Sequence, residues 1–111
     1  IEVGIITGRD SEPLTRRVED LGIRIVLKGR EDKGKALDEI IAQHAIDKSA
    51  IAFAGDDLPD LEVMEQVALA ISVPNGHQEV KAAAHIVTEL PGGRGAVREI
   101  CDFLISFRNS A

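Results

Sequence analysis

Short apolar runs alternate with segments of helical periodicity along the whole chain. The runs predict strands at residues 3–6, 23–27, 50–54, 68–73 and 85–88. Single amphipathic segments lie between successive runs, and another follows the last one. Strands joined by single helices form right-handed crossovers, which give a parallel arrangement covered by helices. The sequence therefore predicts an α/β fold, a three-layer sandwich on a mostly parallel sheet.

Local signals place the helices between these strands. Ser11 is a capping residue, Pro13 suits a first helical turn, and Gly22 ends the helix that they open. Further helices are predicted at 33–44, 59–67, 78–84 and after the glycine-rich loop 91–95. The side chains expected to face inward include His44 on the second helix and, on the last, Val97, Ile100, Cys101, Leu104 and Ile105.

Length and composition limit the class of protein. With 111 residues and 44% hydrophobic content, the chain is predicted to form no more than one domain with a real core. A net charge of −6 argues against a nucleic-acid surface, which needs a basic stripe to displace counterions. No apolar run is as long as a membrane span, and the single cysteine offers no disulfide framework. We therefore expect a cytoplasmic protein that binds neither nucleic acid nor a membrane.

An acidic cluster directly follows the predicted strand 50–54. Asp56, Asp57 and Asp60 are three carboxylates within five residues, and at a strand end they repel one another and lose hydration. A hard cation such as Mg²⁺ is expected to neutralise them. Asp56 is the expected direct ligand, while Asp57 and Asp60 are expected to orient it or to hold a metal-bound water. The alternative is a loop of Asp residues that cap the following helix.

Two further positions suit an anionic phosphate. Thr7 and Gly8 follow the first strand and offer a hydroxyl and backbone N–H groups to a phosphoryl oxygen. Lys33 brings an ammonium group to the start of a helix. The alternatives are an ordinary strand-to-helix turn and a solvated surface lysine. The histidines show no ligand spacing, and His77 and His85 are expected at the surface.

Together these positions resemble the haloacid-dehalogenase-type phosphatases. Thr7 matches the second motif of that family, Lys33 matches the third, and Gly55-Asp56-Asp57-x-x-Asp60 matches the fourth. The segments 6–11 and 92–99 are similar to the 3-deoxy-D-manno-octulosonate 8-phosphate phosphatases, a small branch without a cap domain. The resemblance covers essentially the whole chain. It implies Mg²⁺-dependent hydrolysis of an eight-carbon acidic sugar phosphate, a step in lipopolysaccharide precursor synthesis.

The first motif of the family is absent. It is an Asp-x-Asp that supplies the nucleophile and the general acid, and no Asp-x-Asp occurs in this sequence. In the related fold its strand lies at the centre of the sheet, between the strands that end at Thr7 and Ala54. The resemblance therefore implies that residues 1–111 are the carboxyl-terminal part of a single haloacid-dehalogenase-like domain that lacks its first central strand. We expect this chain alone to be inactive.

The resemblance also implies roles and partners. Mg²⁺ is the expected cofactor, and Thr7, Gly8 and Lys33 are expected to hold the phosphate, with Thr7 and Lys33 taking part in catalysis. Arg9 and Arg94 can pair with the carboxylate of the phosphorylated sugar acid, and a plain surface position is the alternative for each. Members of this branch commonly cover the active site with neighbouring subunits. A homo-oligomer, specifically a tetramer, is therefore expected.

Other classes of function remain open on the sequence alone. A nonulosonate 9-phosphate phosphatase would use the same motifs, which do not distinguish one sugar from another. A catalytically silent domain, such as the tail of a sugar cytidylyltransferase, would keep the fold for oligomerisation. A phosphorylation-dependent receiver domain has a similar alternation of strands and helices, but its acidic cluster is expected early in the chain rather than after the midpoint.

Overall fold

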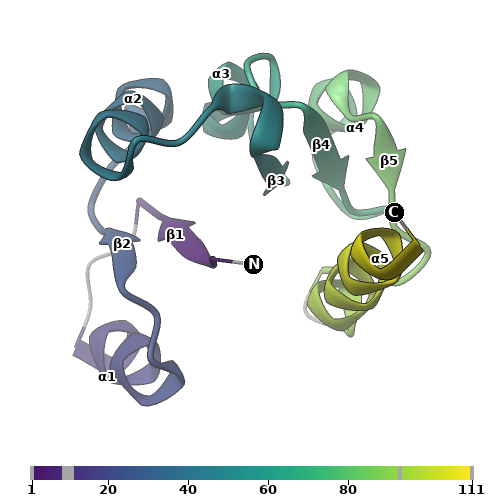
Figure 1. Ribbon diagram of the computed structural model, residues 1–111. Coiled ribbons are helices and arrows are strands. Elements are labelled where there is room, and N and C mark those ends of the chain that lie inside the picture. The colour runs from purple at the N-terminus through teal and green to yellow at the C-terminus, as the bar shows by residue number, and fades with distance from the viewer. Residues whose placement is uncertain (1, 9–11, 93, 111) are drawn as a thin grey trace. The chain divides into compact units, whose positions relative to one another are not determined.

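The computed structural model describes residues 2–8, 12–92 and 94–110, with side chains described at all of these positions except 14, 17, 18 and 106–110 (Figure 1). The chain divides into two compact units, Ile1–Asp47 and Lys48–Ala111. Within each unit the described strands are parallel. The predicted α/β class, with parallel strands layered between helices, is therefore confirmed.

The first unit contains a two-stranded sheet between two helices. Strand β1 (Gly4–Ile6) pairs with β2 (Ile25–Leu27) so that Gly4 lies opposite Ile25. Figure 1 shows this sheet between α1 (Glu12–Leu21) and α2 (Lys33–His44). Helix α1 ends at Gly22, whose φ of 70° is left-handed, as its role of helix terminator predicts. The buried face of α2 carries Gly34, Ala36, Leu37 and Ile40.

The second unit contains a three-stranded sheet in the order β3-β4-β5. Its strands are β3 (Ala52–Ala54), β4 (Leu69–Ser72) and β5 (Ile86–Val87). Figure 1 shows α3 (Leu61–Met64) and α4 (Gln78–Ala83) on one side of the sheet and α5 (Ala96–Ser110) on the other. Short 3₁₀ turns at Lys48–Ala50 and Leu58–Asp60 precede β3 and α3. The largest fully buried side chains of this unit are Met64, Ile71, Val63, Val80 and Ser72.

The first strand of each sheet has a single described partner strand. In the part of the chain that the structure describes, β1 pairs with β2 alone and β3 pairs with β4 alone. Both are therefore edge strands, and their outer backbone N–H and C=O groups are available to another strand. Across the same described ranges, no helix has the length and apolar character needed to cross a membrane.

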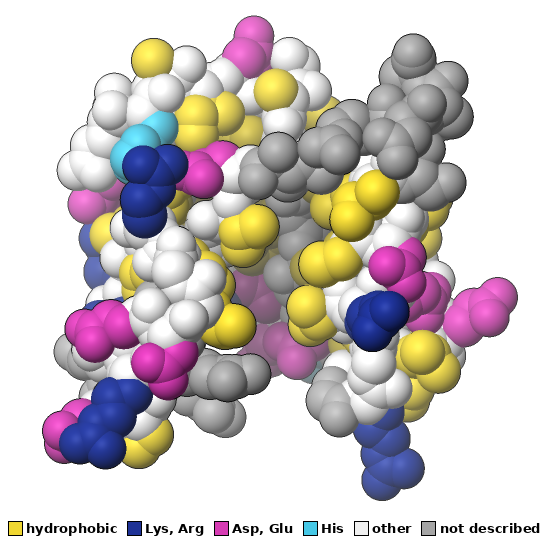
Figure 2. All heavy atoms as spheres, turned by 60° about the horizontal axis from the view of Figure 1, so that its bottom comes forward, with side chains coloured by type: hydrophobic (Ala, Val, Ile, Leu, Met, Phe, Trp, Pro, Cys, Tyr) yellow, Lys and Arg dark blue, Asp and Glu magenta, His cyan; other side chains and the backbone are white. Residues whose placement is uncertain are grey.

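Several expected burials are wrong. His44 is exposed because it lies in the last turn of α2. A basic side chain at the surface there interacts favourably with the negative end of the helix dipole. On α5, Cys101 is exposed, and Val97 and Ile105 remain 72% and 45% exposed. The unit's sheet is narrow and covers only part of this long helix. Figure 2 likewise shows hydrophobic side chains at the surface among charged ones.

Candidate active site

Thr7 continues the pairing of β1 and β2 beyond the end of the strand. Its N–H donates to the carbonyl of Leu27 at 2.9 Å, and its own carbonyl accepts from the N–H of Arg30 at 2.9 Å. The Thr7 side chain is half-buried, while Gly8 is exposed. The backbone at the carboxyl end of β1 is thus held through both its N–H and its C=O by the segment at and after β2, which suits a position expected to present a hydroxyl and a backbone N–H to a ligand.

Lys33 is the first residue of α2, as expected, and its side chain is half-buried while that of Lys35 is exposed. Asp32 occupies the N-cap position before it, and its carbonyl accepts from the N–H of Ala36 at 3.0 Å. The Asp32 carboxylate, however, makes no capping hydrogen bond to the helix. Its backbone φ and ψ of −81° and 62° also lie outside the extended region usual for an N-cap residue.

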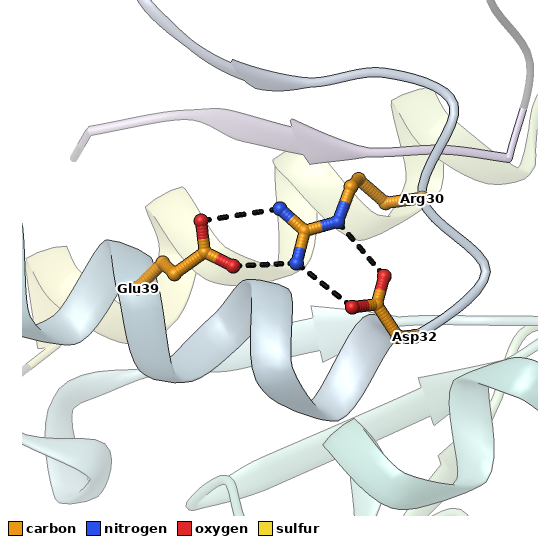
Figure 3. A network of polar contacts seen from close by, with 3 residues as sticks. All are labelled: Arg30, Asp32 and Glu39. Carbon is orange, nitrogen blue, oxygen red and sulfur yellow. Dashed lines mark hydrogen bonds and ion pairs between the residues drawn. The ribbon is translucent and has the colours of Figure 1, made fainter.

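The Asp32 carboxylate instead binds Arg30 (Figure 3). Nε of Arg30 donates to Oδ1 of Asp32 at 2.8 Å, and Nη2 donates to Oδ2 at 2.9 Å. The other side of the guanidinium donates to Glu39 on α2, with Nη1 at 3.1 Å from Oε1 and Nη2 bonded to Oε2. These hydrogen bonds lower the pKa of Asp32 and of Glu39 below their ordinary values and raise the pKa of Arg30.

The acidic loop after β3 is folded around Asp60. The Asp60 side chain is only 3% exposed and accepts from the N–H groups of Asp56 at 3.0 Å and Asp57 at 3.2 Å. Asp57 in turn accepts from the N–H of Leu58 at 2.8 Å, and the side chains of Asp57 and Asp60 each accept from the backbone N–H of the other, which forms a capping box. Capping was the alternative expected for this cluster, and the structure assigns that role to Asp57 and Asp60.

Gly55 is required by this fold of the loop. A Cβ atom at position 55 would lie 2.5 Å from the Cβ of Asp60, which is closer than real side chains approach. The N–H of Gly55 donates to the carbonyl of Ile71 at 3.0 Å, so the loop also continues the pairing of β3 with β4. The first residue of the Gly55-Asp56-Asp57-x-x-Asp60 motif therefore makes room for the last.

The turn between β4 and α4 packs against the acidic loop. The hydroxyl of Ser72 donates to the carbonyl of Gly55 at 2.8 Å, and the N–H of His77 donates to the carbonyl of Asp56 at 2.8 Å. A Cβ atom at Gly76 would lie 2.9 Å from Oγ of Ser72, so only glycine fits there. None of the predicted site residues lies in this turn, and Gly76 is the sequence signal that could have marked its close approach to the acidic loop.

Asn75 connects the same turn to the loop that carries Arg94. Its Oδ1 accepts from the N–H of Gly92 at 2.8 Å, and its Nδ2 donates to the carbonyl of Gly92 at 3.5 Å. The N–H of Arg94 donates to Pro91 at 3.0 Å, and the Arg94 side chain is exposed. Arg94 thus lies in a loop that Asn75 links to the turn between β4 and α4, and that turn packs against the acidic loop. Arg9, the other expected carboxylate-binding residue, lies outside the described residues.

The carboxylates around Asp56 form the candidate Mg²⁺ site. Across residues 2–8, 12–92 and 94–110, no group of three or more His, Cys, Asp or Glu side chains is placed to hold a metal ion. The carboxylates of Asp57 and Asp60 accept capping hydrogen bonds. The Asp56 carboxylate makes no capping hydrogen bond, and its side chain is exposed. Mg²⁺ usually takes only one or two carboxylates and completes its shell with water and phosphate oxygens. Asp56 therefore fits as one ligand of such an ion.

The sequence model of the haloacid dehalogenase-like hydrolases matches residues 22–100. The chain belongs to this family. The match excludes the receiver-domain alternative, and the matched residues include Lys33 and the Gly55-Asp56-Asp57-x-x-Asp60 segment but not Thr7. Thr7, Gly8 and Lys33 lie in the first unit, and Asp56, Asp57, Asp60 and Arg94 lie in the second.

Known relatives define the branch more closely. The 3-deoxy-D-manno-octulosonate 8-phosphate phosphatase KdsC of Yersinia pestis is 43% identical over 105 residues, which cover 95% of this chain and 56% of that protein. The crystal structure of the phosphatase of that name from Moraxella catarrhalis, in complex with a magnesium ion, a phosphate ion and a KDO molecule, matches with a TM-score of 0.92 and 40% identity over 96% of this chain and 61% of that chain.

A third relative binds a different metal. The cobalt-bound form of the deoxy-D-mannose-octulosonate 8-phosphate phosphatase YrbI of Haemophilus influenzae matches with a TM-score of 0.91 and 33% identity, over 96% of this chain and 62% of that chain. The chain thus spans between 56% and 62% of the length of these three relatives.

Proposed function

We propose that this chain is part of a Mg²⁺-dependent phosphomonoesterase that hydrolyses 3-deoxy-D-manno-octulosonate 8-phosphate to the free sugar acid and phosphate, a step in lipopolysaccharide precursor synthesis. The observation that carries the proposal is the match to the Moraxella catarrhalis phosphatase, whose crystal structure holds magnesium, phosphate and a KDO molecule. At 40% identity over 96% of this chain, such a relative supports a shared substrate class as well as a shared fold.

Within this proposal, Asp56 contributes a carboxylate to Mg²⁺, because its side chain is exposed and, unlike those of Asp57 and Asp60, makes no capping hydrogen bond. When bound, the ion would neutralise negative charge on the phosphoryl group. Asp60 and Asp57 fix the backbone on which Asp56 stands, through the hydrogen bonds of the capping box. Their role is to position Asp56.

The first unit supplies the groups that bind phosphate. Lys33 contributes an ammonium group at the start of α2, and Thr7 and Gly8 contribute a hydroxyl and a backbone N–H beyond β1. Preorganised donors of this kind stabilise the charge that develops on the phosphoryl oxygens during transfer. Arg94 is proposed to pair with the carboxylate of the sugar acid, which a guanidinium can bind through two hydrogen bonds.

The nucleophile is proposed to come from outside these 111 residues, since the sequence contains no Asp-x-Asp. The chain by itself should therefore bind ligands without turning them over. The cytoplasmic setting and the tetramer also remain predictions. The exposed apolar side chains of α5, including Val97, give the tetramer a plausible contact surface that light scattering of the intact protein can test.

The proposal is tested by incubating the intact protein with 3-deoxy-D-manno-octulosonate 8-phosphate, with and without Mg²⁺, and measuring the phosphate released. We expect release that depends on Mg²⁺ and is faster than with a nonulosonate 9-phosphate. Faster phosphate release from the nonulosonate 9-phosphate would instead indicate a nonulosonate 9-phosphate phosphatase. No release from either substrate would favour the silent oligomerisation domain.

A further inference from the structure

Three loops of the second unit meet at one end of its sheet, because each follows the carboxyl end of a parallel strand. The acidic loop follows β3, and the turn at residues 73–77 follows β4. The segment 89–95, the arginine loop, follows β5 and carries Arg94. In open parallel sheets, ligands bind outside the carboxyl ends of the strands. The arginine loop therefore lies at the end of the sheet where a ligand is expected.

Asn75 joins the turn after β4 to the arginine loop. Its Oδ1 accepts from the N–H of Gly92 at 2.8 Å, and its Nδ2 lies 3.5 Å from the carbonyl oxygen of the same residue. A Cβ atom at Gly92 would lie 3.4 Å from Oδ1 of Asn75, so the two residues are in close contact. The N–H of Arg94 donates to Pro91 at 3.0 Å. The position of Arg94 thus depends on Asn75 through Gly92.

Glu99 on α5 holds the start of the arginine loop. Its Oε2 accepts from the N–H of Glu89 and its Oε1 from the N–H of Leu90, both at 2.9 Å. The hydroxyl of Thr88 donates to the carbonyl of Leu90 at 2.8 Å. The loop is therefore held at its start by Glu99 and at its middle by Asn75.

Other residues hold the turn that carries Asn75 against the acidic loop. The hydroxyl of Ser72 donates to the carbonyl of Gly55, and the N–H of His77 donates to the carbonyl of Asp56, each at 2.8 Å. Neither hydrogen bond uses the Asn75 side chain. Truncation of Asn75 is therefore expected to release the arginine loop and to leave the acidic loop in place.

The Arg94 guanidinium is available to a ligand. It is exposed, and among the side chains that the structure describes it has no acidic partner. Arg98, four residues further on, lies 3.8 Å from Asp102, and both oxygens of Glu99 are bonded to the backbone. A guanidinium can bind a carboxylate through two hydrogen bonds. Arg94 is thus an unpaired cation on a loop that side chains from two other elements hold in place.

We propose that Asn75 is a positioning residue, which fixes Arg94 relative to the acidic loop and thereby sets a preference for sugar phosphates that carry a carboxylate. The inference rests on the proposed phosphatase function and on the pairing of Arg94 with the sugar acid. It assigns no contact with the substrate to Asn75, which acts through Gly92 and Arg94.

The test measures the binding of two ligands to the intact protein by calorimetry, the free sugar acid 3-deoxy-D-manno-octulosonate and inorganic phosphate. Asn75→Ala should weaken binding of the sugar acid by about fivefold or more, because the long Arg94 side chain must then be ordered on binding. Phosphate binding should stay within about twofold of the wild type, since the two sites are separate. Equal losses for both ligands would overturn the inference, because a general structural defect predicts them.

Steady-state kinetics on the same variant gives an independent measurement. The KM for the sugar phosphate should rise, while kcat and the Mg²⁺ concentration at half-maximal rate should stay close to the wild-type values, because the acidic loop keeps its own hydrogen bonds. A fall in kcat with unchanged KM would overturn the inference.

A double variant shows whether Asn75 acts through Arg94. Arg94→Ala should weaken binding of the sugar acid by about tenfold or more. Adding Asn75→Ala to Arg94→Ala should change it by less than about twofold, because the side chain that Asn75 positions is gone. Additive losses would overturn the inference, and so would unchanged binding in Arg94→Ala.

Lys81→Gln provides a matched control. It breaks another side-chain hydrogen bond to the same turn, from Nζ of Lys81 to the carbonyl of Pro74 at 3.0 Å, and the ratio of the two affinities should not change. Wild-type protein that binds the sugar acid and shows the predicted losses, yet hydrolyses no sugar phosphate, would contradict the proposed function and support the role of Asn75. Wild-type hydrolysis with unchanged sugar-acid binding in Asn75→Ala would do the reverse.

Discussion

Two loops of this chain place Asp residues at the start of a helical segment and use them in opposite ways. In the acidic loop, the carboxylates of Asp57, before the 3₁₀ turn, and Asp60, at its end, accept hydrogen bonds from backbone N–H groups at the start of that turn. In the loop before α2, Asp32 stands at the N-cap and caps nothing, because Arg30 binds both of its carboxylate oxygens. The residue type is the same, and the nearby guanidinium decides what it does.

In each loop, one set of Asp side chains makes structural hydrogen bonds next to a predicted site residue. Capping by Asp57 and Asp60 fixes the backbone and leaves Asp56 exposed at the end of β3. Diversion of Asp32 keeps its carboxylate off the start of α2, beside Lys33. The acidic loop thus carries an exposed carboxylate and the start of α2 carries Lys33, and we predict a metal ion at the first and phosphate at the second. The following changes should break or sharpen this contrast.

The largest expected effect is the loss of activity in Asp56→Asn of the intact protein. The substitution removes a charged ligand and keeps the size of the side chain, so Mg²⁺-dependent phosphate release should fall by about a hundredfold or more. Circular dichroism should show an intact fold, because the capping bonds use only the backbone N–H of Asp56. Glu62→Gln, an exposed change on α3, is the control. Near-normal turnover of Asp56→Asn would remove the metal assignment.

Gly55→Ala should be the most destabilising change in the acidic loop. The added Cβ would meet Asp60 at 2.5 Å, and overpacking of this kind costs about 1–3 kcal/mol of unfolding free energy. Urea denaturation of the intact protein measures it. Gly8→Ala serves as the comparison in the other unit, since its Cβ would lie 3.6 Å from the nearest atom, Cγ of Glu31. Equal stability losses would show that the tight packing around Asp60 is unimportant.

Lys33→Ala should lower kcat/KM of the intact enzyme by about tenfold or more, equivalent to about 1.4 kcal/mol of transition-state stabilisation. Lys35→Ala should change little, because residues two apart on a helix point in different directions and the Lys35 side chain is exposed. Steady-state kinetics on both variants decides between them. A larger effect at Lys35 would move the phosphate-binding motif to that position.

The smallest expected effect concerns pH and the Arg30 network. Because Arg30 lowers the pKa of Asp32 and Glu39 in the folded state, the network stabilises the fold above their ordinary values of 3.8 and 4.5. This stabilisation should disappear as the pH falls through the lowered values. The urea midpoints of wild type and Arg30→Gln should therefore differ at pH 7 and converge as the pH falls below the ordinary pKa values of both carboxyl groups. A constant difference across this range would mean that the network contributes nothing through these carboxylates.

A substantial part of the fold could be predicted from local sequence signals. The five apolar runs all contain strands, and Gly22 ends α1 with the left-handed backbone expected of it. The predicted helix at 59–67 is shorter, with a 3₁₀ turn at Leu58–Asp60 and α3 at Leu61–Met64, because the Asp57–Asp60 capping box tightens the first turn. The motif positions Thr7, Lys33 and Asp56 fall at strand or helix ends as expected, and their roles remain predictions.

The sequence by itself determined the elements and the motif residues, because hydrophobic periodicity, caps and glycine terminators act within one or two turns of the chain. Only the tertiary structure decided which partners hold those residues. Ser72 reaches Gly55 from 17 residues away, and Asn75 reaches Gly92 across the same separation. The Asp32 carboxylate binds Arg30 instead of capping α2, and hydrogen bonds to Glu39 and Thr7 hold Arg30 in position. Such hydrogen bonds depend on how the strands and helices pack, and no local pattern encodes that packing.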